Sequence, residues 1–219
     1  MFFIKPPGVY APQEDTGMLA AALRRESLRP GAEVLDVGTG SGALAVAAAR
    51  LGGRVTAIDA AFAAVLTTRL NAWIAGQRNR VSARRGDLLR PVAGRHFDLV
   101  MANPPYVPSA ARMLPSGGRA RAWDAGPDGR AVLDRLCAEA PALLAPGGVL
   151  LLVHSVLCDP ARTLDLLDGA GLRTSVTDRR IIPFGPVLRE RAPWLEAQGL
   201  IAPGQEKEEL VVIRARRPA

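Results

Sequence analysis

Cysteine and histidine are scarce in this chain of 219 residues, and their positions exclude two common kinds of site. The two cysteines, Cys137 and Cys158, have neither the spacing of metal ligands nor that of a disulfide framework, so we expect buried thiols in a reducing compartment. The two histidines, His96 and His154, are far apart in the sequence. They suggest neither a metal site nor a pair of nucleophile and base, and we assign both a structural role.

Long hydrophobic runs are also missing. The longest apolar stretch, ALLAPGGVLLLV, is interrupted by a proline and two glycines at 146–148, whereas a membrane span requires about 20 uninterrupted apolar residues. The first residues, MFFIKPPGVY, contain too short an apolar run for a signal peptide and no charged region before it. The sequence therefore predicts a cytoplasmic protein with no membrane partner.

Lysine occurs only at positions 5 and 207, so arginine supplies almost all of the positive charge behind the net charge of +7. A basic balance favours contact with nucleic acid or the ribosome, but it sets no specificity. The arginine pairs at 24–25, 84–85, 179–180 and 216–217 are dispersed along the chain. Contact with nucleic acid through arginine is therefore an open alternative.

Short strand-like runs alternate with longer amphipathic segments, which is typical of βαβ units and a parallel sheet. With 48% hydrophobic residues, the chain can form one substantial core. We predict a single α/β domain over 1–219, a Rossmann-like, doubly wound, seven-stranded, mostly parallel sheet flanked by helices. The expected strands are Glu33–Val37, Arg54–Ile58, Val81–Ala83, Phe97–Met101, Val149–His154, Arg173–Asp178 and Leu210–Arg214. The expected helices are Thr16–Ser27, Ala43–Leu51, Ala61–Ala75, Arg130–Leu144, Ala161–Ala170 and Val187–Gln198.

Ligands of doubly wound sheets bind beyond the carboxyl ends of the strands, so the segments that follow the strands are the first candidates for a site. After the first expected strand, LDVGTGSGALA contains Asp36, Gly38, Gly40 and Gly42. Glycines let a backbone turn tightly and approach a ligand closely. Asp36 precedes the first glycine, where a carboxylate would repel a pyrophosphate, so a ligand with a positive charge fits better than NAD.

Acidic residues also follow the next two strands. Asp59 lies 23 positions beyond Asp36, near the offset of about 20 residues at which a carboxylate binds a ribose diol. Asp87 can accept a hydrogen bond from an adenine amine, and Leu88 offers a backbone N–H and an apolar wall. Taken singly, these features also fit tight turns, a helix cap or a surface carboxylate. Their joint placement after successive strands predicts a nucleoside site.

The fourth segment, Asn103, Pro104, Pro105 and Tyr106, ends the expected strand FDLVMA. It is stiff, because proline fixes φ, lacks an N–H and restricts the residue before it. The Asn103 side-chain oxygen and the Pro104 carbonyl can each accept one hydrogen of a flat NH₂ group, and Tyr106 can cover its face. This arrangement suits a primary amide and also an exocyclic adenine amine. A proline-rich turn without further function is the simpler alternative.

These segments together resemble the HemK family of class I S-adenosylmethionine-dependent methyltransferases, particularly its short branch, which lacks an N-terminal helical domain. The matching segments are VYAPQEDTGML (9–19), LDVGTGSG (35–42), AID (57–59), GDLL (86–89), NPPYV (103–107) and WDAGPDGR (123–130). The resemblance implies S-adenosyl-L-methionine as cofactor and S-adenosyl-L-homocysteine as product. It implies that the cofactor is bound by Thr16 at the methionine part, by Asp36, Gly38, Gly40 and Gly42, by Asp59 at the ribose, by Asp87 and Leu88 at the adenine, and by Asn103.

Members of this family methylate the side-chain amide of glutamine in the GGQ motif of peptide-release factors, which is the favoured substrate here. Asn103, Pro104 and Tyr106 are the expected catalytic residues. One alternative is an adenine-N6 methyltransferase acting on RNA or DNA, with phosphate contacts from the arginines at 112, 119 and 121. Another is a cofactor-binding protein without catalysis, although Asn103 and the glycines that such a protein would lose are present.

The remaining expectations concern the periphery of the domain. Residues 1–30 are expected to form a segment and helix over the cofactor site, and 183–208 look like an additional C-terminal insertion of open role. Asp128 and Gly129 are expected to start a helix and to shape the substrate entrance. Eukaryotic and archaeal members of the short branch act with a small zinc-binding activator subunit, which makes such a subunit a candidate partner.

Overall fold

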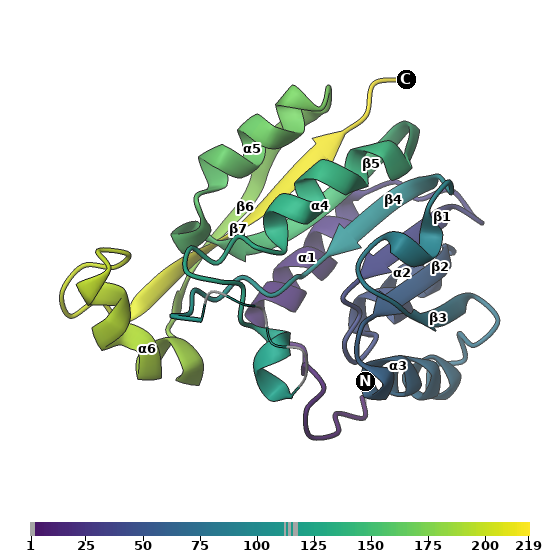
Figure 1. Cartoon of the computed structure of the whole chain (residues 1–219). Helices are drawn as coiled ribbons and strands as arrows, with labels where there is room; N and C mark the ends of the chain where they lie inside the picture. Colours follow the sequence, from purple (N-terminus) through teal and green to yellow (C-terminus); the bar gives the residue numbers. More distant parts are fainter. Residues whose placement is uncertain (1–2, 112, 114, 116–117) are drawn as a thin grey trace.

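A computed structural model describes residues 3–111, 113, 115 and 118–219, and they form a seven-stranded sheet (Figure 1). The strand order is β3-β2-β1-β4-β5-β7-β6, and only β7 runs antiparallel to its two neighbours. The predicted Rossmann-like, mostly parallel sheet is confirmed. Its strands are β1 (Glu33–Val37), β2 (Arg54–Asp59), β3 (Val81–Arg85), β4 (Phe97–Ala102), β5 (Leu144–Ser155), β6 (Arg173–Pro183) and β7 (Lys207–Arg216).

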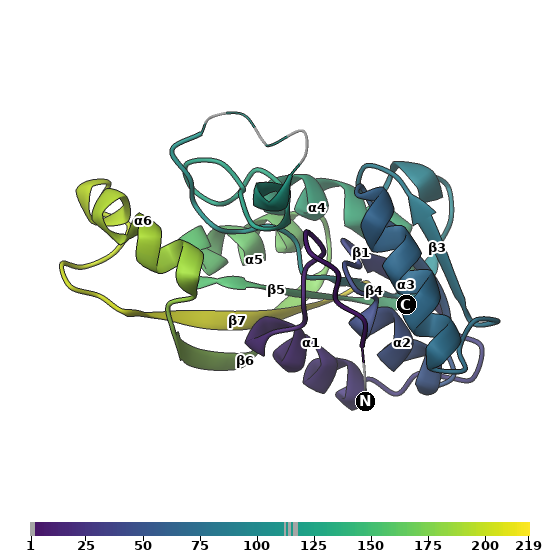
Figure 2. The ribbon, with the colours of Figure 1, turned by 90° about the horizontal axis from the view of Figure 1, so that it is seen from below.

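Helices cover both faces of this sheet, because successive side chains of a strand point to opposite sides. In β1, Val34 packs with the helices of one face, whereas Leu35 packs with those of the other. The first face carries α1 (Glu14–Arg25), α2 (Ala43–Arg50) and α3 (Phe62–Ile74). The second face carries α4 (Leu133–Glu139) and α5 (Pro160–Gly169), as Figure 2 shows from the edge. Short 3₁₀ turns are η1 (Arg90–Val92), η2 (Arg119–Ala122), η3 (Ala140–Leu143) and η4 (Val156–Cys158).

The largest difference from the predicted elements lies at the helix expected over 130–144. Gly129 has φ +70°, and α4 begins only at Leu133. Pro141 then lies in the first turn of η3, where its missing N–H ends the α-helical hydrogen bonding. The strands β5, β6 and β7 are longer than predicted. β6 and β7 pair with each other along nearly their whole lengths, and β5 begins at Leu144, which pairs with Phe97 of β4.

The helix α6 (Pro186–Ala197) lies beyond the end of the sheet, between β6 and β7 in the chain (Figure 1). It has a small core of its own with Phe184, Leu188, Leu195 and Ile201. This helix belongs to the segment 183–208 that the sequence singled out as an addition. Its position brings it next to the site described below.

Both cysteines and one of the two histidines lie in the core. Both cysteines are free and buried, as predicted, and burial raises the pKa of Cys137 to about 11. His154 is buried, which lowers its pKa to about 4 and keeps the ring neutral near pH 7, while His96 lies on the surface. Across the described ranges, none of the helices combines the length and the hydrophobicity that a membrane span requires.

Candidate active site

A cavity of about 480 Å³ lies where the carboxyl ends of the first four strands meet, in the size range of a small-molecule site. The sequence predicted eleven site residues, and eight of them line this cavity. Those eight are Gly38, Gly40, Asp59, Asp87, Leu88, Asn103, Pro104 and Tyr106. The remaining three, Thr16, Asp36 and Gly42, lie behind the lining.

The glycine-rich loop after β1 is fastened to the end of β2. Gly38 and Gly40 have φ of +70° and +54°, which a residue with a Cβ adopts only under strain. The Gly40 N–H donates to Asp59 Oδ2 at 3.0 Å, and the Ala61 N–H donates to Oδ1 at 2.8 Å. Each Asp59 oxygen keeps a further lone pair for a ligand. Gly42 has another role, because a Cβ there would lie 2.9 Å from the Thr68 side chain of α3.

Asp36 supplies a buried negative charge behind this loop. Its side chain is 1% exposed, and its Oδ2 accepts a hydrogen bond of 2.6 Å from the Thr39 hydroxyl. Burial raises the pKa of Asp36 to about 6, and the Thr39 hydrogen bond opposes that rise. Its Oδ1 has no hydrogen-bond partner within the described part of the chain. A carboxylate placed this way favours a ligand that brings positive charge.

Asp87 and Leu88 form the third loop, which contains backbone strain. Leu88 has φ +45°, a conformation that side chains other than glycine seldom adopt and that is frequent at functional sites. Both oxygens of Asp87 accept hydrogen bonds from Arg135 of α4, at 3.2 and 2.8 Å. Arg135 thereby holds the pKa of Asp87 below its usual value. The predicted adenine contact would thus be made by a carboxylate whose orientation Arg135 already fixes.

Asn103 is oriented from behind by Thr16. The Asn103 Nδ2 donates to the Thr16 Oγ1 at 3.4 Å. Because the NH₂ of Asn103 is engaged with this hydroxyl, its Oδ1 is the atom left to accept a hydrogen bond from a ligand. The structure therefore places Thr16 in support of Asn103, outside the wall of the cavity.

A buried carboxylate, Asp15, ties the N-terminal segment to the NPPY loop. Its Oδ2 accepts hydrogen bonds from the Tyr10 hydroxyl at 2.5 Å and from the Tyr106 hydroxyl at 3.0 Å. Its Oδ1 accepts from the Thr16 N–H and hydroxyl. Burial raises the pKa of Tyr106 well above its usual value, so the hydroxyl remains a donor. The YAPQEDT and NPPY segments, far apart in sequence, thus form one hydrogen-bonded unit.

The far side of the NPPY loop is held by the WDAGPDGR segment. Val107 pairs with Asp124 through a bridge, in which the Val107 N–H donates to the Trp123 carbonyl at 2.7 Å. A Cβ at Gly129 would lie 2.5 Å from the Tyr106 carbonyl, so only glycine fits there. The expectation that Gly129 starts a helix is therefore wrong: it packs directly against the NPPY loop, and α4 begins four residues later.

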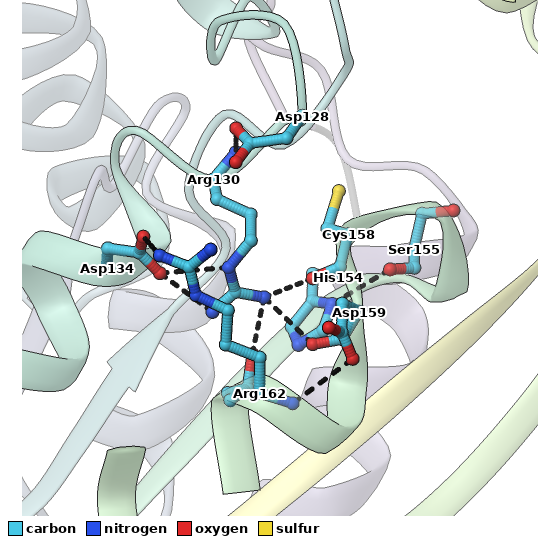
Figure 3. Close-up of polar contacts among 9 residues, drawn as sticks. Asp128, Arg130, Asp134, His154, Ser155, Cys158, Asp159 and Arg162 are labelled. Carbon is cyan, nitrogen blue, oxygen red and sulfur yellow. Dashed lines mark hydrogen bonds and ion pairs between the residues drawn. The ribbon is translucent and has the colours of Figure 1, made fainter. Parts of the chain in front are cut away.

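Arg130 is the centre of the network behind this loop (Figure 3). Its side chain is 2% exposed and reaches Asp134 of α4 at 2.8 Å. On the other side it donates to the carbonyls of Cys158 and Asp159 and to the Thr163 hydroxyl. The Cys158 thiol in turn donates to the Tyr106 carbonyl at 2.9 Å. One buried guanidinium therefore joins α4, η4 and α5 beneath the NPPY loop.

The segment 183–208 forms another wall of the cavity. Its lining residues include Gly185, Pro186 and Leu188 at the start of α6. Arg191 of α6 binds the Asp124 carboxylate at 2.6 Å and the Pro108 carbonyl at 2.9 Å, so α6 is attached to the chain that follows NPPY.

The arginines expected to contact nucleic acid give no evidence of such a surface. Position 112 and the side chain at 119 lie outside the described residues. Arg121 lines the cavity, and its charge lowers the pKa of Asp59 and of Asp87. For Asp59 the net pKa is nevertheless raised, because burial outweighs this effect.

The sequence reasoning did not single out four of the residues that line the cavity: Tyr10, Asp15, Arg135 and Glu208. Tyr10 and Asp15 lie inside the quoted VYAPQEDTGML segment, so the motif itself could have identified them. Arg135 lies five residues beyond the end of the DGR segment and carries no pattern of its own. Glu208 stands in a charged run, QEKEEL, which resembles an exposed turn.

The fold and this site together define a class I methyltransferase. The chain belongs to the methyltransferase small domain family, which matches residues 1–115. It is 31% identical over 179 residues to a Methanocaldococcus jannaschii protein named provisionally as a protein N5-glutamine methyltransferase, covering 81% of this chain and 88% of that protein. The resemblance to the HemK family is confirmed.

Two further proteins are similar. The release factor glutamine methyltransferase of Moorella thermoacetica is 39% identical over 153 residues, which are 67% of this chain and 54% of that protein. This chain therefore spans about half of that relative. The solved E. cuniculi Mtq2–Trm112 complex, responsible for methylation of the eRF1 translation termination factor, superposes with a TM-score of 0.62 and 26% identity, covering 96% of this chain and 99% of that chain.

Proposed function

We propose that this chain transfers a methyl group from S-adenosyl-L-methionine to the side-chain amide nitrogen of a glutamine in a peptide-release factor. The observation that carries the proposal is the arrangement of the NPPY loop, residues 103–106, which forms a rim of the cavity (the NPPY rim). In it the Asn103 NH₂ donates to Thr16, so the Asn103 Oδ1 is the atom left to accept a hydrogen bond. The relatives named above act on glutamine, which favours this acceptor over an adenine amine.

The methyl donor would occupy the part of the cavity between the glycine loop and Leu88. Asp59 has lone pairs for a ribose diol, and Leu88 and Ile58 provide apolar walls for a base. The acidic groups Asp36 and Asp59 suit a ligand with a positive sulfonium and an ammonium group. When bound, the donor supplies the electrophilic methyl carbon. The described residues fit such a ligand in size and charge.

The residues of the rim would hold the acceptor. An amide nitrogen is a weak nucleophile, because its lone pair is delocalised into the carbonyl. Asn103 Oδ1 and the Pro104 carbonyl accept the two N–H groups and fix the direction of the nitrogen, while the Tyr106 ring covers one face of the amide. Correct orientation of two reactants can contribute up to about 7–11 kcal/mol to catalysis. Asp15 and the prolines keep these acceptors from relaxing away.

Transfer of label from S-adenosyl-L-methionine tests this proposal. The purified chain is incubated with release factor, with release factor whose GGQ glutamine is changed to alanine, and with bulk RNA and DNA. We expect label on the first protein only. Label on nucleic acid alone would replace the proposed acceptor by an adenine or another base amine.

A second proposal concerns a partner: we propose that a small activator subunit binds α3. The helix exposes an apolar stripe of Phe62, Leu66, Leu70, Trp73 and Ile74, with exposed fractions from 42 to 61%. Their spacing of three and four residues places them on one side of the helix. The helix α3 lies beside β3, an edge strand of the sheet (Figure 2). Contiguous exposed apolar surface of this kind is typical of protein interfaces, and the solved relative Mtq2 is itself in a complex with Trm112.

Replacing Trp73 by aspartate should prevent co-purification with the co-expressed subunit, because a charge would be buried in the interface. Leu166→Asp is the matched control, since Leu166 is an apolar residue of α5 that is 41% exposed. Size-exclusion chromatography with light scattering measures the complex. If Trp73→Asp retains the subunit as well as Leu166→Asp does, α3 is not the binding surface.

A further inference from the structure

Glu208 is a buried carboxyl group on the wall of the cavity, at the second position of the strand β7. Its side chain is 7% exposed, and it lines the same cavity as Asn103 and Tyr106. Its Oε2 has no hydrogen-bond partner within the described residues. Buried carboxyl groups are usually paired or hydrogen-bonded, so a buried, unpartnered carboxyl oxygen in the wall of a ligand cavity requires an explanation.

The charge that acts on Glu208 is that of another acidic residue. The Ser155 hydroxyl at the end of β5 lowers the pKa of Glu208, and Asp15 of α1 raises it. The charge of Glu208 in turn raises the pKa of Tyr10, Tyr106 and Cys158. None of the ion pairs among the described residues includes Glu208.

Burial without a cation raises the pKa of Glu208 to about 7. Near neutral pH the group therefore exchanges between its acid and carboxylate forms. A carboxyl group with a strongly raised pKa in a cleft is a candidate for acid–base chemistry.

Methylation of a primary amide leaves a proton that must be removed. As the N–C bond forms, the C–S bond breaks and its electron pair returns to sulfur, so the positive charge passes to a nitrogen that carries two hydrogens and the new methyl group. The Asn103 Oδ1 and the Pro104 carbonyl accept hydrogen bonds but are weak bases. Asp15 is already engaged by two tyrosines and by Thr16.

We propose that Glu208 is the proton acceptor of the reaction, an inference that rests on the proposed methylation of an amide nitrogen at the NPPY rim. Its carboxylate takes one hydrogen from the nitrogen as the N–C bond forms. The products are then a neutral N-methyl amide, a neutral thioether and protonated Glu208, which releases its proton to water when the products leave. General bases of enzymes work best when their pKa lies near the working pH.

Single-turnover rates of Glu208→Gln, measured on both sides of neutral pH, test the assignment. In the wild type the carboxylate is the active form, so the rate should rise as the pH increases through about 7. Glu208→Gln keeps the shape but cannot accept a proton. We expect its rate to fall by about 10²–10⁴-fold and the pH dependence around 7 to disappear, while the affinity for S-adenosyl-L-methionine, measured by calorimetry, stays unchanged. Glu208→Asp, which retains a carboxylate, should recover part of the rate and the pH dependence.

The matched control is Glu209→Gln, at the next position of β7. Glu209 points to the other side of the strand and pairs with the exposed Arg179, so this variant should keep the wild-type rate and pH profile. A wild-type rate and profile in Glu208→Gln would overturn the inference, as would a lost rate that Glu208→Asp shares without any pH dependence. If the wild type methylates a base amine instead of the release factor, the proposed acceptor is wrong. The Glu208 comparison can then be repeated on that amine, so the two failures remain distinguishable.

Discussion

Replacement of Asn103 by alanine should nearly abolish methyl transfer and leave the affinity for the methyl donor close to that of the wild type. In the proposed reaction, the variant loses the Oδ1 that accepts one hydrogen of the acceptor amide, so the nitrogen would no longer be held in line with the methyl carbon. Removal of one preorganised polar group from a reaction centre costs about 10²–10³-fold in kcat. Single-turnover rates and calorimetric titration of the donor measure the two effects separately.

Thr16→Val is a graded control for this prediction. It keeps Asn103 and removes only the hydroxyl that accepts the Asn103 NH₂ at 3.4 Å. Asn103 then rotates more freely, and we expect a rate between those of the wild type and of Asn103→Ala. Full activity in Asn103→Ala, or a complete loss of donor binding in it, contradicts the role assigned to this residue.

Replacement of Arg130 by methionine should destabilise the fold more than any change at the surface. The variant removes a cation that is 2% exposed and leaves the Cys158 and Asp159 carbonyls, the Thr163 hydroxyl and Asp134 short of a partner. Breaking a buried ion pair from one side typically costs about 3–5 kcal/mol. Urea unfolding followed by circular dichroism measures the free energy of unfolding.

Arg162→Met is the matched control, because it tests whether the loss of stability in Arg130→Met comes from the burial of the arginine side chain. Arg162 binds the same carboxylate, Asp134, at 2.5 Å, but its side chain is 50% exposed. Exposed ion pairs contribute about 0–1 kcal/mol, so this variant should remain close to the wild type. If Arg130→Met and Arg162→Met lower the free energy of unfolding equally, Arg130 contributes no more to stability than an exposed arginine does.

The sequence predicted the fold and the positions of the site loops because both depend on local patterns. Alternation of apolar runs identified all seven strands, and the segments after the first four contain the glycines, Asp59, Asp87 and NPPY that meet at the cavity. The boundaries of α4 and β5 depend on Pro141 and on the long-range pairing of Leu144 with Phe97 of β4, which no local pattern reports.

The residues that support the site were less accessible to sequence reasoning. Thr16 follows Asp15 in the chain, and only the packed structure shows that both accept hydrogen bonds from side chains of the NPPY loop. Arg130 was part of a recognised segment, yet its burial depends on α5 and η4, which follow later in the chain. The role proposed for Glu208 depends on the burial of its side chain, which neither composition nor residue spacing predicts.

The place of β7 determines when the catalytic centre can be assembled during synthesis. This strand is made after β6 but is inserted between β5 and β6, and it carries Glu208. A nascent chain that ends before position 207 has the NPPY loop and the glycine turn, but β5 and β6 each expose an unpaired edge. The growing polypeptide is therefore prone to edge-to-edge association until its seventh strand joins the sheet.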